Sequence, residues 1–246
     1  MTSIGDRDYD REATDQPAHA YAFEFDCIMH EFMMRTFRPM FAGKSALELG
    51  CYHGNFTRLL CAQFGSVDVV DASSECIRLA TAAVDNGADF HHCRFDEFRP
   101  ARKFENIFLI HTLEHLDQRV AGLSQMASWL APAGRMFIAT PNAHAGSRQI
   151  AVAMGIIDRP TAITEAERAH GHTLTYTLES LEREAREAGL SIESKGGIFF
   201  KALANFQIDK ALEAGIISPE YLEGCYMVGS GYPDLCSSIY LVCSHG

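Results

Sequence analysis

Histidines and a glutamate, whose side chains can take part in catalysis, occur in two segments of the sequence. The segment HTLEH, residues 111–115, directly follows an apolar run, and His172 lies in a polar segment further along the chain. Imidazole is the usual general base in proteins because its pKa lies near neutrality. We therefore predict His172 first, and His115 second, as the group that takes a proton from a bound substrate.

The same five residues match the H-x-x-E-H pattern of a class of zinc hydrolases. Such a site needs both histidines on one face of a helix and a third protein ligand. His111 adjoins an apolar strand, so we expect His111 and His115 not to share a helix. We predict no metal site and keep a zinc-dependent hydrolase as an alternative.

A turn that contains two glycines points to a nucleotide-like ligand. The segment LELGCYHGNF, residues 47–56, joins an apolar strand to a helix, which is where α/β sheets bind nucleotides. Gly50 and Gly54 permit close approach of a ligand and of the helix start. Asp71 ends the next strand. Its separation from Glu48 along the chain is close to the roughly 20 residues at which a carboxylate binds ribose hydroxyls in nucleotide-binding folds.

The spacing of these glycines disfavours a phosphate-bearing cofactor. It is G-x-x-x-G rather than G-x-G-x-x-G, and no G-x-x-x-x-G-K-[ST] motif occurs. The acidic Glu48 before the turn suits a ligand with positive charge at that end. S-adenosylmethionine fits these features, because it has an amino group and a sulfonium but no phosphate.

Short apolar strands alternate with amphipathic helices along most of the chain. We predict strands at residues 45–49, 66–70, 90–93, 106–110, 135–140, 190–200 and 237–243, and helices at residues 20–37, 55–64, 74–84, 116–130 and 178–188. Repeated strand–helix units with right-handed crossovers predict an α/β fold, with a doubly wound parallel sheet.

The 246 residues are predicted to form a single domain. The polar residues 2–17 are expected to be mobile. Residues 142–172 and 201–236 exceed ordinary connections, so we predict them to be loops inserted on the substrate side.

The composition excludes several classes of protein. With 21 Lys and Arg against 32 Asp and Glu, the net charge is −11, which would repel nucleic acid. No apolar run reaches the roughly 20 residues that span a bilayer, so we expect no membrane segment. We see no secretory signal and predict a cytoplasmic protein. The eight cysteines lack a CxxC pair and are predicted to be reduced.

Four segments resemble, in order, the motifs of class I S-adenosylmethionine-dependent methyltransferases. They are ALELGCYHGNFTRLL, VDVVDAS, IFLIHTLEHL and LAPAGRMFIATPN. The resemblance runs over residues 44–243 and is strongest to the small-molecule group typified by ubiquinone-biosynthesis O-methyltransferases and by methyltransferases of sugar and natural-product pathways. It implies a Rossmann-like, mostly parallel seven-stranded sheet whose last strand is antiparallel, with S-adenosylmethionine as the cofactor.

The resemblance also assigns the methionine end of the cofactor. Gly50 and Gly54 would approach it, with Glu48 beside them. Tyr52 stands where the family has its middle glycine, and we predict that its side chain walls the cofactor pocket. His111, at the end of the fourth strand, would lie beside the methionine through its backbone.

By the same resemblance Asp71 would bind the ribose, and Phe95 with Asp96 would flank the adenine. No [ND]-P-P-[YFW] motif follows the fourth strand, which further disfavours a nucleic-acid acceptor.

We assign binding of the methyl acceptor to residues far along the chain from the glycine-containing turn. Lys201 and Asn205 supply a cation and an amide, which suit a polyhydroxylated or carboxylated molecule. Tyr176 is predicted to join them. Residues 1–42 would form a helical lid, a role common in the resembling enzymes, in which Tyr21 and Phe25 contact the substrate.

We therefore predict a methyltransferase that moves a methyl group from S-adenosylmethionine to a hydroxyl, or less readily to an amine, of a polar small molecule. In-line transfer needs alignment of the reactants, and a base only for a hydroxyl acceptor. Besides the zinc hydrolase, a non-catalytic cofactor-binding module stays open, as do the acceptor's identity and the oligomeric state.

Overall fold

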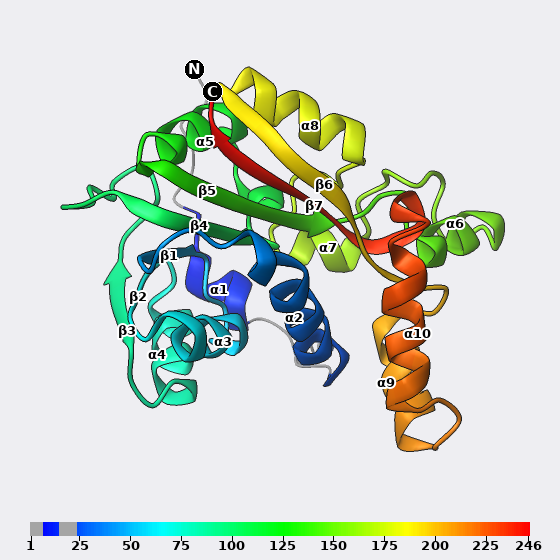
Figure 1. Ribbon diagram of the computed structural model, residues 1–246. Helices are drawn as coiled ribbons and strands as arrows, with labels where there is room; N and C mark the ends of the chain where they lie inside the picture. The colour runs from blue at the N-terminus through cyan, green and yellow to red at the C-terminus, as the bar shows by residue number, and fades with distance from the viewer. Residues whose placement is uncertain (1–6, 15–23) are drawn as a thin grey trace.

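The computed structural model describes residues 7–14 and 24–246. Its strands are β1 Ala46–Leu49, β2 Val67–Asp71, β3 Ala88–His92, β4 Phe104–Ile110, β5 Leu130–Pro141, β6 Leu190–Phe200 and β7 Cys236–His245. They form one seven-stranded sheet in the order β3-β2-β1-β4-β5-β7-β6 (Figure 1). Since β7 runs antiparallel to both β5 and β6 while β1 to β5 pair in parallel, the predicted sheet is confirmed.

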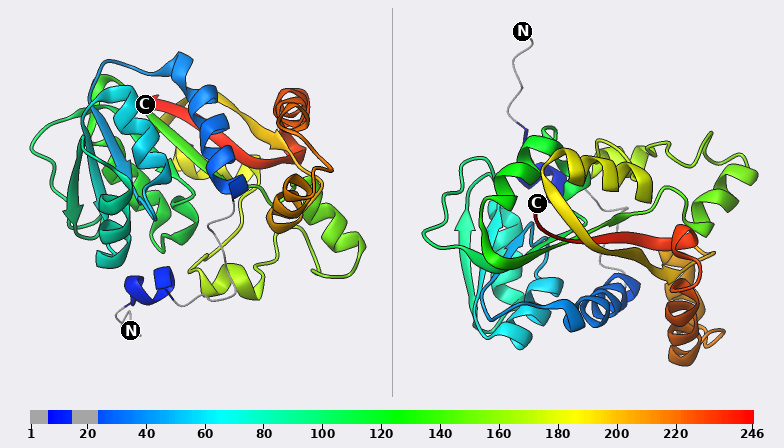
Figure 2. Two further views of the ribbon diagram at one scale, coloured as in Figure 1. Left: turned by 90° about the horizontal axis from the view of Figure 1, so that it is seen from below. Right: turned by 45° about the horizontal axis from the view of Figure 1, so that its top comes forward.

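Helices cover both faces of this sheet. They are α1 Tyr9–Thr14, α2 Glu24–Phe37, α3 Asn55–Phe64, α4 Ser74–Ala83, α5 Arg119–Ala127, α6 Gly146–Ala153, α7 Glu165–Ala169, α8 Leu178–Glu187, α9 Asn205–Glu213 and α10 Pro219–Gly229. Short 3-10 turns lie at η1 Arg38–Met40, η2 Leu113–His115 and η3 Pro233–Leu235. Figure 2 shows the layers, with α5 and α8 on one face and α2 and α3 on the other.

Alternating side chains on the central strands fill two cores. On β4, Ile107 and Leu109 join the core under α5 and α8, whereas Phe108 and Ile110 join the core under α2, α3 and α4. This follows from the two-residue period of a strand. Because both faces are covered, the central strands are apolar nearly throughout.

The helix caps follow the sequence. The Ser73 hydroxyl accepts a hydrogen bond from the Cys76 backbone N–H at 3.0 Å, and so caps α4. The Thr177 hydroxyl accepts one from the Ser180 N–H at 3.1 Å, and so caps α8. These caps satisfy amide groups that have no partner within their helices, which confirms both predicted helix starts.

The predicted boundary between the helix at 116–130 and the fifth strand is wrong. α5 ends at Ala127, and β5 already begins at Leu130, so Pro132 and Gly134 lie within the strand. The pairing of β4 with β5 shifts register here, and a Cβ on Gly134 would stand 2.7 Å from the carbonyl oxygen of Phe104. Proline and glycine are tolerated at such an irregular site, so they did not break the strand.

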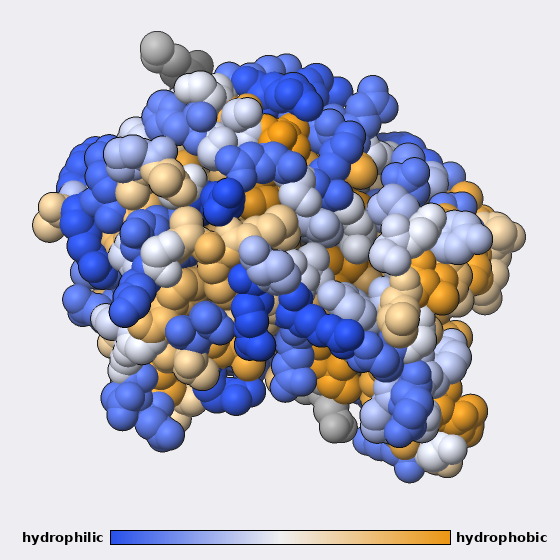
Figure 3. Space-filling model, in the orientation of Figure 1, coloured by the Kyte–Doolittle hydropathy of each residue, from blue (hydrophilic) through white to orange (hydrophobic). Residues whose placement is uncertain are grey.

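The two long stretches that were predicted as loops contain helices. Residues 142–172 hold α6 and α7, and residues 201–236 hold α9 and α10. Figure 3 shows orange, apolar atoms on the surface in the region of these helices. The large apolar side chains that are exposed in the described part of the chain all come from these two stretches: Ile150, Met154, Ile156, Leu203, Phe206, Ile216, Tyr221, Met227, Val228 and Tyr232. Among residues 7–14 and 24–246, no helix has the length and apolarity needed to cross a bilayer.

Part of the polar segment that was expected to be mobile is ordered, since residues 9–14 form α1, which packs against α4. The Asp10 carboxylate accepts hydrogen bonds from the Ser73 hydroxyl at 2.7 Å, the Ser74 hydroxyl at 2.8 Å and the Glu75 N–H at 3.1 Å. These bonds lower the pKa of Asp10 to about 2. A carboxylate at the positive end of α4 anchors this polar segment, although it has no apolar periodicity.

Replacing Gly54 with alanine is expected to destabilise the fold. Gly54 has a φ of 81°, and a Cβ on it would stand 2.8 Å from the Cα of Ala80 on α4. The left-handed conformation costs alanine about 1–2 kcal/mol, and the backbone clash adds about 1–3 kcal/mol. Urea denaturation should therefore show a loss of about 2–4 kcal/mol in the free energy of unfolding.

Gly65→Ala is the matched control, because Gly65 has a φ of 78° but no atom within 4 Å of its Cβ position. It should lose only a conformational part, about 1–3 kcal/mol, because its ψ of −33° lies outside the left-handed helical region. Equal losses in the two variants would show that the contact with Ala80 is unimportant.

Candidate functional site

A cavity of about 500 Å³ opens at the carboxyl ends of β1, β2 and β4. This is the edge at which doubly wound sheets bind their ligands. It is lined by most of the predicted site residues: Phe25, Glu48, Gly50, Tyr52, Asp71, Phe95, Asp96, His111, His115, His172 and Asn205.

The glycine-containing turn has the backbone that its glycines permit. Gly50 has a φ of 86°, and a Cβ there would stand 2.6 Å from the Thr112 hydroxyl oxygen. Tyr52, where the related family has glycine, adopts a φ of 44°, and its ring stacks on that of His53 with centroids 3.8 Å apart. A non-glycine residue in this conformation costs about 1–2 kcal/mol, which the surrounding structure must offset.

Asp71 holds the turn and faces the cavity. Its carboxylate accepts hydrogen bonds from the Cys51 N–H at 2.9 Å and from the Ser73 N–H at 2.8 Å. Glu48 lies nearby and is 1% exposed; burial, together with the negative charge of Asp71, raises the pKa of Glu48 to about 8. A cationic ligand group would therefore meet two carboxyl groups at this end of the cavity.

The loop after β3 forms a second wall. Phe95 and Asp96 line the cavity, and Arg94 forms an ion pair with Asp96 at 3.0 Å. The hydrogen bond from Arg94 lowers the pKa of Asp96. Arg94 thus holds the acidic side chain in the loop that was predicted to flank the adenine.

His115 and His172 come together in the cavity. Their ring centroids lie 4.6 Å apart with the planes at 79°. Burial lowers the pKa of His172 to about 4 and that of His115 well below its usual value. Both rings are therefore neutral at physiological pH.

His111 is separate from this pair. It precedes η2 with a φ of 50°, and its Nε2 lies 2.9 Å from the Ser238 hydroxyl oxygen. As expected, His111 and His115 do not share a helix. The two histidines of H-x-x-E-H therefore lack the geometry that the hydrolase motif requires.

Several predicted residues do not line the cavity. Tyr176 was wrongly placed beside the substrate: it is fully buried in the core under α5 and α8, where its hydroxyl donates to Glu184 Oε2 at 2.5 Å. Lys201 does not line the cavity either, although Asn205 does. The ammonium of Lys201 donates a hydrogen bond to Asn205 Oδ1, and burial lowers the pKa of Lys201 to about 8. Gly54 packs against α4 instead, and Tyr21 lies outside the described residues.

Sequence reasoning missed several residues of the cavity. Glu114 had a signal, because it lies within the HTLEH segment. His30 and Asp26 lie four residues apart on α2, so both line the cavity from one face of that helix. Arg7, which also lines it, had no signal, because its segment lacks periodicity.

Acidification is expected to destabilise the protein partly through His30. Burial lowers the pKa of His30 from 6.5 to about 4, and its Nδ1 has no hydrogen-bond partner among residues 7–14 and 24–246. Because the folded pKa is the lower one, stability from the neutral ring is present above pH 6.5 and is lost as the pH falls toward 4. Between about pH 7.5 and pH 5 this amounts to about 2 kcal/mol.

Chemical denaturation of wild-type protein and of His30→Gln at both pH values tests this prediction. The variant should lose about 2 kcal/mol less on acidification. The same pH dependence in both proteins would contradict the role of His30.

Comparison with known proteins identifies the family of this chain. A methyltransferase domain model matches residues 19–195. Ubiquinone biosynthesis O-methyltransferases are similar: the one from Thiobacillus denitrificans is 24% identical over 176 residues, 68% of this chain and 72% of that protein. The one from Aeromonas salmonicida is 23% identical over 230 residues, 89% of this chain and 93% of that protein.

Solved structures share the fold. N-methyltransferase NodS from Bradyrhizobium japonicum WM9, in complex with S-adenosyl-L-homocysteine, has a TM-score of 0.62 at 16% identity, with 96% of each chain covered. An S-adenosylmethionine-dependent methyltransferase from Mesorhizobium loti has a TM-score of 0.60 at 16% identity, covering 86% of this chain and 97% of that one.

The family model spans most of the chain, and the glycine turn, Asp71 and the cavity lie at the edge at which doubly wound sheets generally bind ligands. The match to methyltransferases replaces the two alternative predictions, a zinc hydrolase and a non-catalytic cofactor-binding module. The chain belongs to the methyltransferase domain family, as a class I enzyme that uses S-adenosylmethionine.

Proposed function

We propose that this enzyme methylates a hydroxyl oxygen of a polar small molecule, such as a sugar or a natural-product intermediate. The observation that carries the proposal is the pair of imidazoles, His115 and His172, which face the cavity together. A hydroxyl is a weak nucleophile until its proton is removed, and imidazoles beside it are suited to activate it. The O-methyltransferase names of the curated relatives support the same acceptor.

The cofactor would lie along the carboxyl ends of β1 and β2. We propose that Asp71 accepts hydrogen bonds from the ribose hydroxyls, and that Phe95 and Asp96 flank the adenine. The position of all three on the cavity wall supports this arrangement. Ionised carboxylates form charge-assisted hydrogen bonds with hydroxyl and amino groups, and these bonds are stronger than hydrogen bonds between neutral groups.

The methionine end would meet Gly50, Tyr52 and Glu48. The carboxyl of Glu48 suits the ammonium or the sulfonium, and the positive φ of Gly50 keeps the backbone open to the ligand. His111 would lie beside the same group, with its ring held by Ser238.

The acceptor would enter between α2 and the two long insertions, 142–172 and 201–236. Phe25 and Asn205 line that side of the cavity, and Lys201 would act by holding Asn205. We propose a single domain in which α1 and α2 form a lid. The net charge of −11 favours a small molecule over nucleic acid. A cytoplasmic location stays a prediction.

The test is product analysis with matched acceptors. A panel of polyhydroxylated compounds, their amine counterparts and their methyl ethers is incubated with S-adenosylmethionine, and S-adenosylhomocysteine and the methylated products are measured by mass spectrometry. We expect O-methylated products from the hydroxyl compounds. Exclusive methylation of amines would overturn the hydroxyl assignment, and NodS, named an N-methyltransferase, shows that this fold also hosts that activity.

A further inference from the structure

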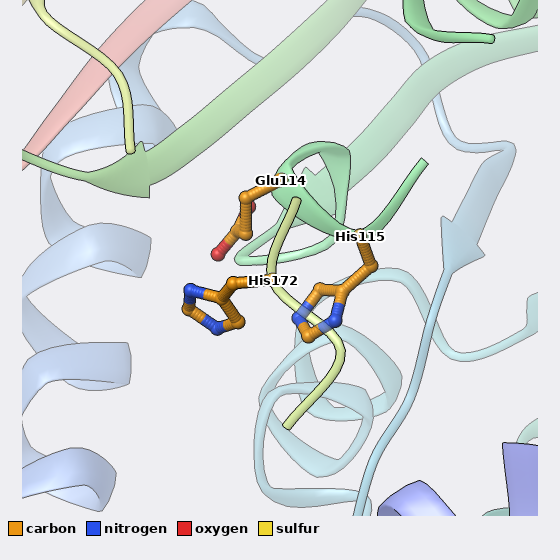
Figure 4. A group of neighbouring side chains, drawn as sticks. All are labelled: Glu114, His115 and His172. Atoms are coloured by element: carbon orange, nitrogen blue, oxygen red, sulfur yellow. The ribbon is translucent and has the colours of Figure 1, made fainter. Parts of the chain in front are cut away.

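Three side chains in the acceptor half of the cavity form an arrangement that methyl transfer alone does not require. Glu114 and His115 come from η2 after β4, and His172 comes from the loop before α8. Figure 4 shows the three side chains gathered in one place. A carboxylate oxygen of Glu114 and one ring nitrogen of each histidine all lie within 4.8 Å of one another.

Within the described part of the chain, the carboxyl group of Glu114 is buried without a partner, a feature that it shares with Glu48 at the other end of the cavity. Glu114 is 1% exposed, and neither of its carboxylate oxygens has a hydrogen-bond partner among the residues that the structure describes. Such a group is costly to bury in either protonation state. A cation between the three side chains would remove this cost.

The backbone holds these residues in place from both sides. The Thr173 N–H and hydroxyl both donate to the Glu114 carbonyl oxygen at 2.9 Å, which ties the two segments together. The Arg7 guanidinium donates to the carbonyl oxygens of His115 and Gly171, and so closes the cluster from the side of α1. The two backbone segments that carry the three side chains are therefore fixed relative to each other before any ligand binds, which favours a metal site.

We propose that Glu114, His115 and His172 bind one divalent transition-metal ion, which holds the acceptor hydroxyl for methylation. Two imidazoles and one carboxylate suit Zn²⁺, Co²⁺ or Mn²⁺, and three protein ligands leave positions open for a substrate. Metal–ligand distances of about 2.0–2.2 Å put neighbouring ligand atoms roughly 3–4 Å apart, so small side-chain movements complete the site. All three residues line the cavity, so the open positions face the acceptor.

The ion would act as a Lewis acid on the acceptor oxygen. A bound cation lowers the pKa of a hydroxyl, and the released proton passes to solvent. The oxygen then forms a bond to the methyl carbon, the carbon–sulfur bond breaks, and its electron pair remains on sulfur as the neutral thioether. This inference rests on the proposed hydroxyl acceptor, and it replaces the expectation from sequence that no metal is bound.

The test begins with metal binding, which does not depend on activity. Protein stripped with a chelator is titrated with Co²⁺ and Zn²⁺, and binding is followed by calorimetry and by the visible absorption of Co²⁺. We expect one ion per chain in the wild type, and at least tenfold weaker binding in Glu114→Gln and in His115→Ala. His144→Ala is the matched control, since His144 is exposed and outside the cavity lining.

Thermal unfolding separates a metal ligand from a merely structural residue. Zn²⁺ should raise the Tm of the wild type but not that of Glu114→Gln, because a ligand stabilises only the state that binds it. Without metal, Glu114→Gln should be at least as stable as the wild type, because it removes a buried carboxyl group without a partner. Equal metal binding in the wild type and in Glu114→Gln, or none in either, would overturn the site.

Turnover distinguishes this inference from the proposed function. Chelator-treated wild type should lose at least tenfold in kcat and regain it when Co²⁺ or Zn²⁺ is added. Full O-methylation by the stripped enzyme would overturn the role of the metal but leave the proposed function intact. Metal binding without any O-methylation would overturn the proposed function and leave the site.

Discussion

Replacing Asp71 with alanine is expected to weaken binding of S-adenosylmethionine by about 10²- to 10⁴-fold. The proposed pair of hydrogen bonds from the ribose hydroxyls to this carboxylate is charge-assisted, and each such bond contributes about 1.5–3 kcal/mol. The carboxylate also accepts the Cys51 and Ser73 amides, so the variant loses part of the support of the glycine turn. Calorimetric titration with S-adenosylmethionine and with S-adenosylhomocysteine measures the loss directly.

Asp68→Asn is the matched control for this prediction. Asp68 lies on the same strand, β2, but is paired with Arg102 at 2.5 Å and with His91 at 3.1 Å, outside the cavity lining. We expect its cofactor affinity to stay within about twofold of wild type, because the side chain of Asp68 does not line the cavity. Wild-type affinity in Asp71→Ala would show that the ribose lies elsewhere.

The second large effect is expected from His172→Ala. If this imidazole activates the acceptor, directly or through a bound metal ion, kcat should fall by about 10²- to 10⁴-fold. The affinity for S-adenosylmethionine should change little, because Asp71 and Gly50 lie at the cofactor end of the cavity. Steady-state kinetics at saturating acceptor, with calorimetry of cofactor binding, separate these two quantities.

The exposed His144, which follows β5, supplies the control for this variant as well. His144→Ala should retain near wild-type kcat. If His172→Ala also retained it, the reaction would proceed by alignment of the reactants alone, or with a base elsewhere in the cavity.

The position of Gly50 and Asp71 on the cavity wall was predictable because their sequence signals are local. Gly50 and Asp71 each follow a short apolar strand, and parallel strands end at one edge of the sheet, so neighbours along the chain become neighbours in space. The acceptor side lacked such signals. Tyr176 was misplaced because a tyrosine near the end of a loop has no periodicity to show whether it faces the cavity or the core, and its pairing with Glu184 is a tertiary contact.

The sequence by itself determined the alternation of strands and helices, the glycine turn and the histidine-containing segment after β4, because periodicity, turn chemistry and capping act over a few residues. Only the tertiary structure decided that Glu114 and His115 meet His172. Side chains so far apart along the chain are brought together by the sheet and by the loop that Thr173 ties to η2. Packing of the whole molecule also buries the Glu114 carboxyl group beside the two imidazoles, and that juxtaposition is what the proposed metal site rests on.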